Sequence, residues 1–187
     1  MFRIFVKWCV KIFTLIVFRV KTYGQENIEE GKPYIMCANH ISNWDALTIY
    51  TATKREMFVN KFVHWFGRKM NVFPLKRGKQ DIESIKKSLK VLKDNKILLI
   101  FPEGTRNGMK KNGKIQNGPA YLAARSGVEV LPVRIEGNFK FFRQMKIHYG
   151  KPLDFSRYQS KKPEKETLDL ISSEITKAIF GEEYLNK

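Results

Sequence analysis

The sequence predicts an α/β protein in which helices cover both faces of a mostly parallel sheet. Short apolar runs of strand length, such as Tyr34–Ala38 and residues 97–101, alternate with segments of helical periodicity. Both runs end in polar loops, as parallel strands do at the sheet edge where ligands bind. Neither an internal repeat nor a linker interrupts this alternation, so residues 19–187 are expected to form a single domain.

The elements expected before residue 80 are short. Pro33 precedes the run Tyr34–Ala38, and residues 46–50 continue as a helix that starts near Asp45. The other elements expected here are a strand within residues 17–23, a buried strand at 57–59, a helix at 62–70 and an edge or bulged strand at 71–77, which Pro74 interrupts.

Helical periodicity is clearest from residue 82 onward. Four apolar residues recur every three or four positions and predict a helix that buries them and turns its lysines outward: Ile82, Ile85, Leu89 and Leu92. Pro119 and Gly127 mark the start and the end of a second helix. The remaining expected elements are a surface loop at 107–118, strands at 128–135 and 146–149, and a last amphipathic helix at about 163–180.

Residues 1–18 are predicted to form an amphipathic helix outside the domain. Its polar positions recur at helical spacing between apolar and aromatic side chains: Arg3, Lys7, Lys11 and Thr14. The charge-free run 12–18 is shorter than the roughly 20 apolar residues that span a bilayer, and no small-residue cleavage site follows it. The pattern favours a helix that lies in a membrane interface with its lysines toward anionic headgroups. The alternative is a helix packed on the domain's own sheet.

The net charge indicates an anionic partner. Lysine and arginine number 35 against 18 aspartates and glutamates, which gives a formal charge of +17. Charge alone does not choose among a membrane surface, a phosphorylated substrate and a nucleic acid.

His40 is the best candidate for chemistry, because it follows Tyr34–Ala38 at a strand-to-helix turn and Asp45 lies five positions on. A position just before a helix favours the neutral imidazole that a general base needs. Asp45 would accept a hydrogen bond from the other ring nitrogen and hold the tautomer. The chain must turn between the two, and Ser42 and Asn43 are suitable capping residues. The alternative is a capping box in which Asp45 merely holds the helix start.

A second polar loop follows residues 97–101. Arg106 offers a planar fork suited to phosphate, Gly104 lets backbone N–H groups approach a ligand, and Thr105 adds a hydroxyl. Arg77 is a candidate for a second phosphate contact. The alternative interpretation is a tight turn with solvated charges.

Other motifs lack the setting that their chemistry requires. A P-loop-like stretch at 108–114 is followed by Ile115 instead of a hydroxyl, and no G-x-S-x-G nucleophile elbow is present. Cys9 and Cys37 lie in apolar segments without metal-ligand spacing, which indicates buried free thiols in a reducing compartment and no metal site. The aromatic, basic stretch 139–146 fits edge-strand packing as well as RNA stacking, so no nucleic-acid partner is expected.

Four blocks, in this order, resemble those of the glycerolipid acyltransferase family, and within it the bacterial 1-acylglycerol-3-phosphate acyltransferases: His40 with Asp45, Arg77, Phe-Pro-Glu-Gly-Thr-Arg at 101–106, and Val-Leu-Pro-Val at 130–133. The resemblance covers about residues 21–155. The chain departs from the family at Asn71, where glycine is usual, at Asn107, where serine is usual, and at residues 62–65. These departures leave the acceptor open.

The resemblance implies transfer of a fatty acyl group to the free sn-2 hydroxyl of 1-acylglycerol-3-phosphate, which gives phosphatidate. A thioester of coenzyme A or of acyl carrier protein would be the co-substrate, and no cofactor or metal is implied. His40 would be the general base and Asp45 its orienting acid, without a covalent acyl-enzyme. By matching position, the acceptor and its phosphate would be bound by Glu103, Gly104, Thr105, Arg106, Arg77 and Lys61.

The resemblance also implies a peripheral or monotopic enzyme on the cytoplasmic face of the cell membrane, where it takes a lysophospholipid from an anionic leaflet. Two alternatives remain. The acceptor is glycerol-3-phosphate or another lysophospholipid, or the chain is a non-catalytic basic protein that binds a membrane or a nucleic acid.

Overall fold

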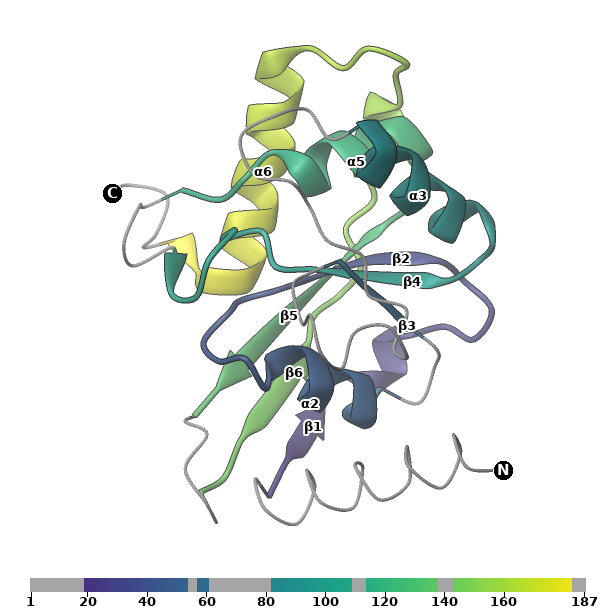
Figure 1. The fold of residues 1–187 in the computed structure, drawn as a ribbon. Coiled ribbons are helices and arrows are strands. Elements are labelled where there is room, and N and C mark those ends of the chain that lie inside the picture. The colour runs from purple at the N-terminus through teal and green to yellow at the C-terminus, as the bar shows by residue number, and fades with distance from the viewer. Residues whose placement is uncertain (1–18, 54–56, 61–81, 109–113, 138–142, 183–187) are drawn as a thin grey trace.

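The computed structural model describes residues 19–53, 57–60, 82–108, 114–137 and 143–182. Within them lies a six-stranded sheet with the strand order β1-β6-β5-β2-β4-β3 (Figure 1). The strands are β1 (Lys21–Tyr23), β2 (Tyr34–Ala38), β3 (Met57–Asn60), β4 (Ile97–Ile100), β5 (Val130–Glu136) and β6 (Lys146–Tyr149). The helix predicted for residues 1–18 and the elements predicted at 62–70 and 71–77 fall outside the described residues.

The sheet is parallel at every pairing except that of β5 with β6, which is antiparallel. Nine residues join these two strands, which is fewer than the dozen or so that a parallel crossover needs. Pro132 lies within β5, yet its carbonyl still accepts a hydrogen bond from the backbone N–H of Gly150 at 2.8 Å. The prediction of a mostly parallel sheet is confirmed.

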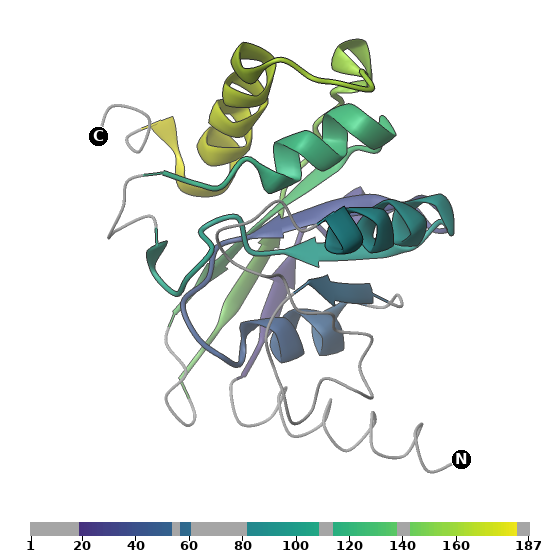
Figure 2. The same ribbon diagram turned by 45° about the horizontal axis from the view of Figure 1, so that its top comes forward.

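Helices lie on both faces of the sheet, as predicted (Figures 1 and 2). One face is covered by α2 (Asp45–Ala52), and the other by α3 (Ile82–Lys93), α5 (Gly118–Ser126) and α6 (Lys165–Phe180). Two short 3-10 helices, η1 (Gln25–Asn27) and η3 (Ser156–Tyr158), belong to the connecting segments. None of the described helices is long and apolar enough to cross a membrane.

Strand β2 supplies both hydrophobic cores, because successive side chains of a strand point to opposite faces. Tyr34, Met36 and Ala38 pack on the side of α2, whereas Ile35 and Cys37 pack on the side of α3, α5 and α6. All five are fully buried, so the unbroken apolar run marks a central parallel strand. His40 follows directly from this most buried part of the fold.

The buried face of α3 differs from the predicted one. Leu92 is buried as expected and Ile85 and Leu89 are partly buried, but Ile82 is 60% exposed. Ser84 and Ser88 are buried instead. Small side chains at positions four apart let α3 pack closely against its neighbours α5 and β4, which turns Ile82 outward.

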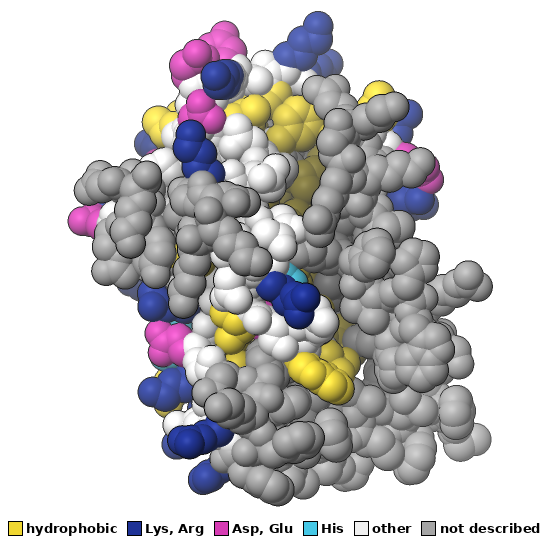
Figure 3. All heavy atoms as spheres, turned by 60° about the vertical axis from the view of Figure 1, so that its left-hand side comes forward, with side chains coloured by type: hydrophobic (Ala, Val, Ile, Leu, Met, Phe, Trp, Pro, Cys, Tyr) yellow, Lys and Arg dark blue, Asp and Glu magenta, His cyan; other side chains and the backbone are white. Residues whose placement is uncertain are grey.

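Basic side chains lie on the surface around β1, β5 and the loops beside them, as the net charge leads one to expect. Four of the exposed ones are Arg19, Lys21, Arg134 and Arg143. Figure 3 shows Lys and Arg side chains along the lower left edge of one face of the molecule.

Candidate active site

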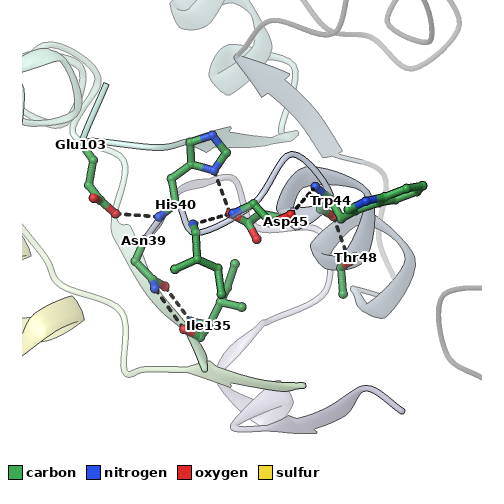
Figure 4. A network of polar contacts seen from close by, with 9 residues as sticks. Asn39, His40, Trp44, Asp45, Thr48, Glu103 and Ile135 are labelled. Carbon is green, nitrogen blue, oxygen red and sulfur yellow. Dashed lines mark hydrogen bonds and ion pairs between the residues drawn. The ribbon is translucent and has the colours of Figure 1, made fainter. Parts of the chain in front are cut away.

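His40 and Asp45 meet across the turn that joins β2 to α2 (Figure 4). The Nδ1 atom of His40 lies 2.7 Å from Oδ2 of Asp45. His40 is 7% exposed, and Asp45 is fully buried. The chain therefore makes the turn that the predicted pair requires.

One oxygen of Asp45 also holds the turn itself. Its Oδ2 accepts hydrogen bonds from the backbone N–H groups of Ile41 at 2.7 Å and Ser42 at 2.8 Å. The contact with Ser42 is the carboxylate half of a capping box. The hydroxyl of Ser42 accepts from the backbone N–H of Trp44 at 3.3 Å, so the serine half is not formed with Asp45. Asp45 thus stabilises the helix start and contacts the imidazole at the same time.

The contact with Asp45 indicates which ring nitrogen of His40 carries the hydrogen. Because a carboxylate oxygen is an acceptor, the ring nitrogen facing Oδ2 of Asp45 must carry the hydrogen. The neutral ring then has its lone pair on Nε2, the nitrogen that does not face Asp45. Phe101 stacks on the imidazole with ring centroids 4.4 Å apart, which restricts its rotation. The contacts with Asp45 and Phe101 together fix the orientation of the imidazole.

The loop after β4 holds the main chain of His40. Glu103 is 3% exposed, and its Oε1 accepts a hydrogen bond from the backbone N–H of His40 at 2.6 Å. The backbone N–H of Asn107 donates to the carbonyl of His40 at 2.6 Å. Both backbone polar groups of His40 are therefore bound by one loop, which joins the two predicted sites into a single structure.

Two residues of this loop have left-handed backbone conformations, Gly104 with φ 68° and Asn107 with φ 52°. Gly104 and Thr105 are half-buried, and the Arg106 side chain is exposed. Arg106 thus stands at the surface of the loop whose buried parts contact His40. The loop therefore presents an accessible guanidinium and holds the main chain of His40.

The structure brings six of the eight predicted site residues to one edge of the sheet: His40, Asp45, Glu103, Gly104, Thr105 and Arg106. Lys61 and Arg77 lie outside the described residues, and their placement remains a prediction. In the part of the chain that the structure describes, no three His, Cys, Asp or Glu side chains gather as metal ligands.

Sequence reasoning missed Asn39, which precedes His40 and is buried at 9% exposure. Its side-chain amide forms two hydrogen bonds with the backbone of Ile135 in β5, which Figure 4 shows below the histidine. A polar residue at the end of an apolar strand was the available signal. The contact with Phe101 was also missed, because an apolar residue at a strand end reads simply as core.

Two other reactive side chains belong to the fold. Cys37 is a buried free thiol, as predicted, and burial raises its pKa far above the ordinary range. His148 stacks on Tyr23 with ring centroids 4.8 Å apart on the β1–β6 pair, so it packs against a neighbouring strand. Cys9 is outside the described residues.

Comparisons with known proteins show the family to which the chain belongs. Residues 19–136, more than half of the chain, match the acyltransferase family. The chain therefore belongs to the acyltransferase family of enzymes.

The bacterial relatives named 1-acyl-sn-glycerol-3-phosphate acyltransferase include two that align with more than three quarters of this chain. The protein of Bacillus subtilis (strain 168) is 30% identical over 160 residues, which cover 76% of this chain and 79% of that protein. The protein of Streptococcus pneumoniae (strain ATCC BAA-255 / R6) is 27% identical over 161 residues, which cover 78% of this chain and 59% of that protein.

A crystal structure of the 1-acyl-sn-glycerophosphate (LPA) acyltransferase PlsC from Thermotoga maritima has the same fold. The two structures superpose with a TM-score of 0.62 at 23% sequence identity, and the match covers 92% of this chain and 79% of that chain.

Proposed function

We propose that this protein transfers a fatty acyl group from an acyl thioester to the sn-2 hydroxyl of 1-acylglycerol-3-phosphate, which gives phosphatidate. The observation that carries the proposal is the 2.7 Å contact between His40 Nδ1 and Asp45 Oδ2, which leaves Nε2 as a base at the ligand-binding edge of the sheet. The names of the relatives supply the acceptor.

The reaction proceeds by direct attack of the acceptor. Nε2 of His40 removes the proton of the hydroxyl while the hydroxyl oxygen forms a bond to the thioester carbonyl carbon. The tetrahedral intermediate then collapses, the C–S bond breaks, and the thiolate takes the proton from the imidazolium. Asp45 stabilises the imidazolium during these steps. The acyl group passes to the acceptor without a covalent acyl-enzyme.

The loop at 103–107 is proposed to bind the acceptor phosphate through Arg106. Its exposed guanidinium can form two parallel hydrogen bonds to phosphate oxygens, and Gly104 and Thr105 add backbone and hydroxyl donors. Glu103 is proposed to support the site indirectly. Its buried carboxylate accepts a hydrogen bond from the backbone N–H of His40, and a carboxylate in direct contact with a phosphate would repel it. Lys61 and Arg77 are proposed as further phosphate contacts on the resemblance of their positions.

The partners follow from the same proposal. Coenzyme A or acyl carrier protein delivers the acyl group, and no cofactor or metal takes part in the steps above. The formal charge of +17 favours an anionic leaflet as the source of the lysophospholipid. We therefore propose peripheral or monotopic binding at the cytoplasmic face of the cell membrane.

An assay that crosses acceptors with donors tests the function. Purified protein is mixed with lysophosphatidate, glycerol-3-phosphate or a lysophospholipid with a larger headgroup, each with coenzyme A and carrier-protein thioesters. We expect the highest kcat/KM with lysophosphatidate. A higher kcat/KM with another acceptor would identify that acceptor, instead of lysophosphatidate, as the substrate. Absence of acyl transfer to all three would refute the proposed activity.

The role of Arg106 is tested in the same assay. Arg106→Ala should raise KM for lysophosphatidate and leave kcat closer to that of the wild type, because Arg106 binds the phosphate at a distance from the reacting atoms. Arg134→Ala is a matched control, since Arg134 is an exposed arginine on β5. Equal KM values for wild type and Arg106→Ala would show that Arg106 does not bind the acceptor phosphate.

A further inference from the structure

Asn39 closes a gap that the sheet leaves open beside the active site. Strand β2 ends at Ala38, which pairs with Val133, but β5 continues to Glu136. Residues two apart in a strand direct their backbone groups to the same neighbour, so the N–H and C=O of Ile135 face the side that β2 has just left. Two buried backbone groups there need partners.

The Asn39 side chain provides both partners. Its Oδ1 accepts the backbone N–H of Ile135 at 2.6 Å, and its Nδ2 donates to the Ile135 carbonyl at 3.0 Å. The backbone N–H of Asn39 reaches the carbonyl of Val133 only at 3.4 Å. The side-chain amide thus continues the β2–β5 pairing by one step after the main chain has begun to turn away.

The next residue is held from the opposite side. His40 uses its backbone N–H and C=O to contact Glu103 and Asn107 in the loop after β4. Because β2 lies between β5 and β4, residues 39 and 40 are fastened to both neighbours at the point where β2 ends. The Cα atom of His40 is fixed by these contacts before the imidazole contacts Asp45.

We propose that Asn39 is a positioning residue for acyl transfer, which acts by fixing the main chain from which His40 reaches the substrate hydroxyl. The inference rests on the proposed function of His40 as the base. A general base works only within hydrogen-bond reach of its proton, and a displacement of about 1 Å can lower a rate on the order of 10²-fold. Asn39 itself needs no contact with substrate.

The chemistry of the contact is specific for an amide. Alanine removes both hydrogen bonds. Aspartate keeps an acceptor for the Ile135 N–H but sets its second oxygen against the Ile135 carbonyl when it is ionised, and it regains a donor when it is protonated. The variant Asn39→Asp therefore restores the contact as the pH falls.

The test compares Asn39→Ala and Asn39→Asp with a matched control, Asn27→Ala. Asn27 also uses its side-chain amide to bind a strand carbonyl, that of Tyr149 at 2.9 Å, but it lies in η1 and not in the turn at His40. Thermal unfolding of each variant sets a temperature at which all are folded, and kcat and KM are measured there.

We expect Asn39→Ala to lower kcat by at least about tenfold with KM values within about twofold of the wild type. Asn27→Ala should lose a comparable amount of stability and keep its kcat. The ratio of kcat for Asn39→Asp to that of the wild type should rise from pH 8 to pH 5.5. Wild-type kcat in folded Asn39→Ala, or an equal loss in Asn27→Ala, would overturn the proposal.

A second readout does not depend on turnover. The Nδ1–H proton of His40, held by Asp45, should give a low-field proton NMR signal in the wild type and in Asn27→Ala. We expect this signal to weaken or shift in Asn39→Ala, and in Asn39→Asp if alanine prevents folding. An unchanged signal in both Asn39 variants would refute the positioning role, even if the wild type acylates none of the tested acceptors.

Discussion

His40 and Asp45 form a buried pair in which one carboxylate oxygen serves both the imidazole and the turn that carries it. Oδ2 of Asp45 lies 2.7 Å from the ring nitrogen of His40 and also accepts two backbone N–H groups of the turn. Asp45 is therefore both a helix cap and the partner of His40, and the same oxygen atom makes both kinds of contact. Substitutions can separate the two tasks.

Asp45→Asn should preserve the turn and impair catalysis. An amide oxygen can still accept the backbone N–H groups of Ile41 and Ser42, but it carries no charge to stabilise the imidazolium. We expect kcat to fall by about 10² to 10⁴-fold, with smaller changes in KM. Asp45→Ala should additionally lower the free energy of unfolding by about 1 to 2 kcal/mol through loss of the turn contacts. Denaturant unfolding and steady-state kinetics measure both, and wild-type kcat in Asp45→Asn would contradict the role of the charge.

Glu103 should tolerate glutamine better than alanine. Glutamine keeps an oxygen that can accept the buried N–H of His40, whereas alanine leaves that donor without this partner. We expect Glu103→Ala to lower the free energy of unfolding by about 1 to 3 kcal/mol. It should also lower kcat, because the main chain of His40 is released. If Glu103→Gln were as impaired as Glu103→Ala in kcat and in stability, the acceptor role of this side chain would be wrong.

Tyr149 makes stability fall in alkaline solution. Burial raises the pKa of Tyr149 from 10.0 to about 12, although the hydrogen bond with Thr53 lowers it. The folded protein keeps this proton at pH values where the unfolded chain has lost it, so the free energy of unfolding decreases between pH 10 and pH 12. The decrease due to Tyr149 is about 1 kcal/mol at pH 11.

Tyr149→Phe isolates that contribution from the other groups that titrate at high pH. The variant should be less stable by about 1 kcal/mol at pH 8, because the hydrogen bond to Thr53 is lost. Its stability should then decline less than that of the wild type from pH 8 to pH 11. Guanidinium unfolding at both pH values measures the difference, and parallel declines would contradict the assignment.

The two ends of α3 should respond differently to truncation. Ile82→Ala should change the free energy of unfolding by no more than about 0.5 kcal/mol, because Ile82 is 60% exposed. Leu92→Ala should cost about 2 to 5 kcal/mol, because Leu92 is 2% exposed and lines the core shared with α5 and α6. Urea unfolding of both variants decides whether α3 buries the face seen in the structure or the one that its apolar periodicity predicted.

Most of the sheet could be predicted because its strands are buried on both faces. Unbroken apolar runs such as Tyr34–Ala38 reflect that burial directly, and the polar loops after β2 and β4 follow from the shared edge of parallel strands. The turned face of α3 depends on tertiary packing. Hydrophobicity assigns Ser84 and Ser88 to the surface, although small side chains also suit a close helix contact.

The functional groups of the candidate site could be predicted from the sequence, but the contacts that hold them in place could not. His40, Asp45 and Arg106 carry functional groups whose proposed roles follow from residue type and spacing. The contacts that hold these residues in place use the backbone of His40, Asn107 and Ile135. Backbone groups are the same in every residue type, so the sequence does not indicate such contacts. The sequence alone indicates an ordinary turn residue at Asn39. Its role follows only from the structure, in which β5 continues past the end of β2 and leaves the backbone of Ile135 without a strand partner on that side.

The most direct measurement compares kcat of purified wild type, His40→Ala and His148→Ala with lysophosphatidate and an acyl thioester. His148→Ala is the matched control, because His148 lies on β6 and stacks on Tyr23. We expect His40→Ala to remain folded and to lose about 10² to 10⁴-fold in kcat, while His148→Ala retains its activity. Wild-type turnover in folded His40→Ala would contradict the assignment of His40 as the general base.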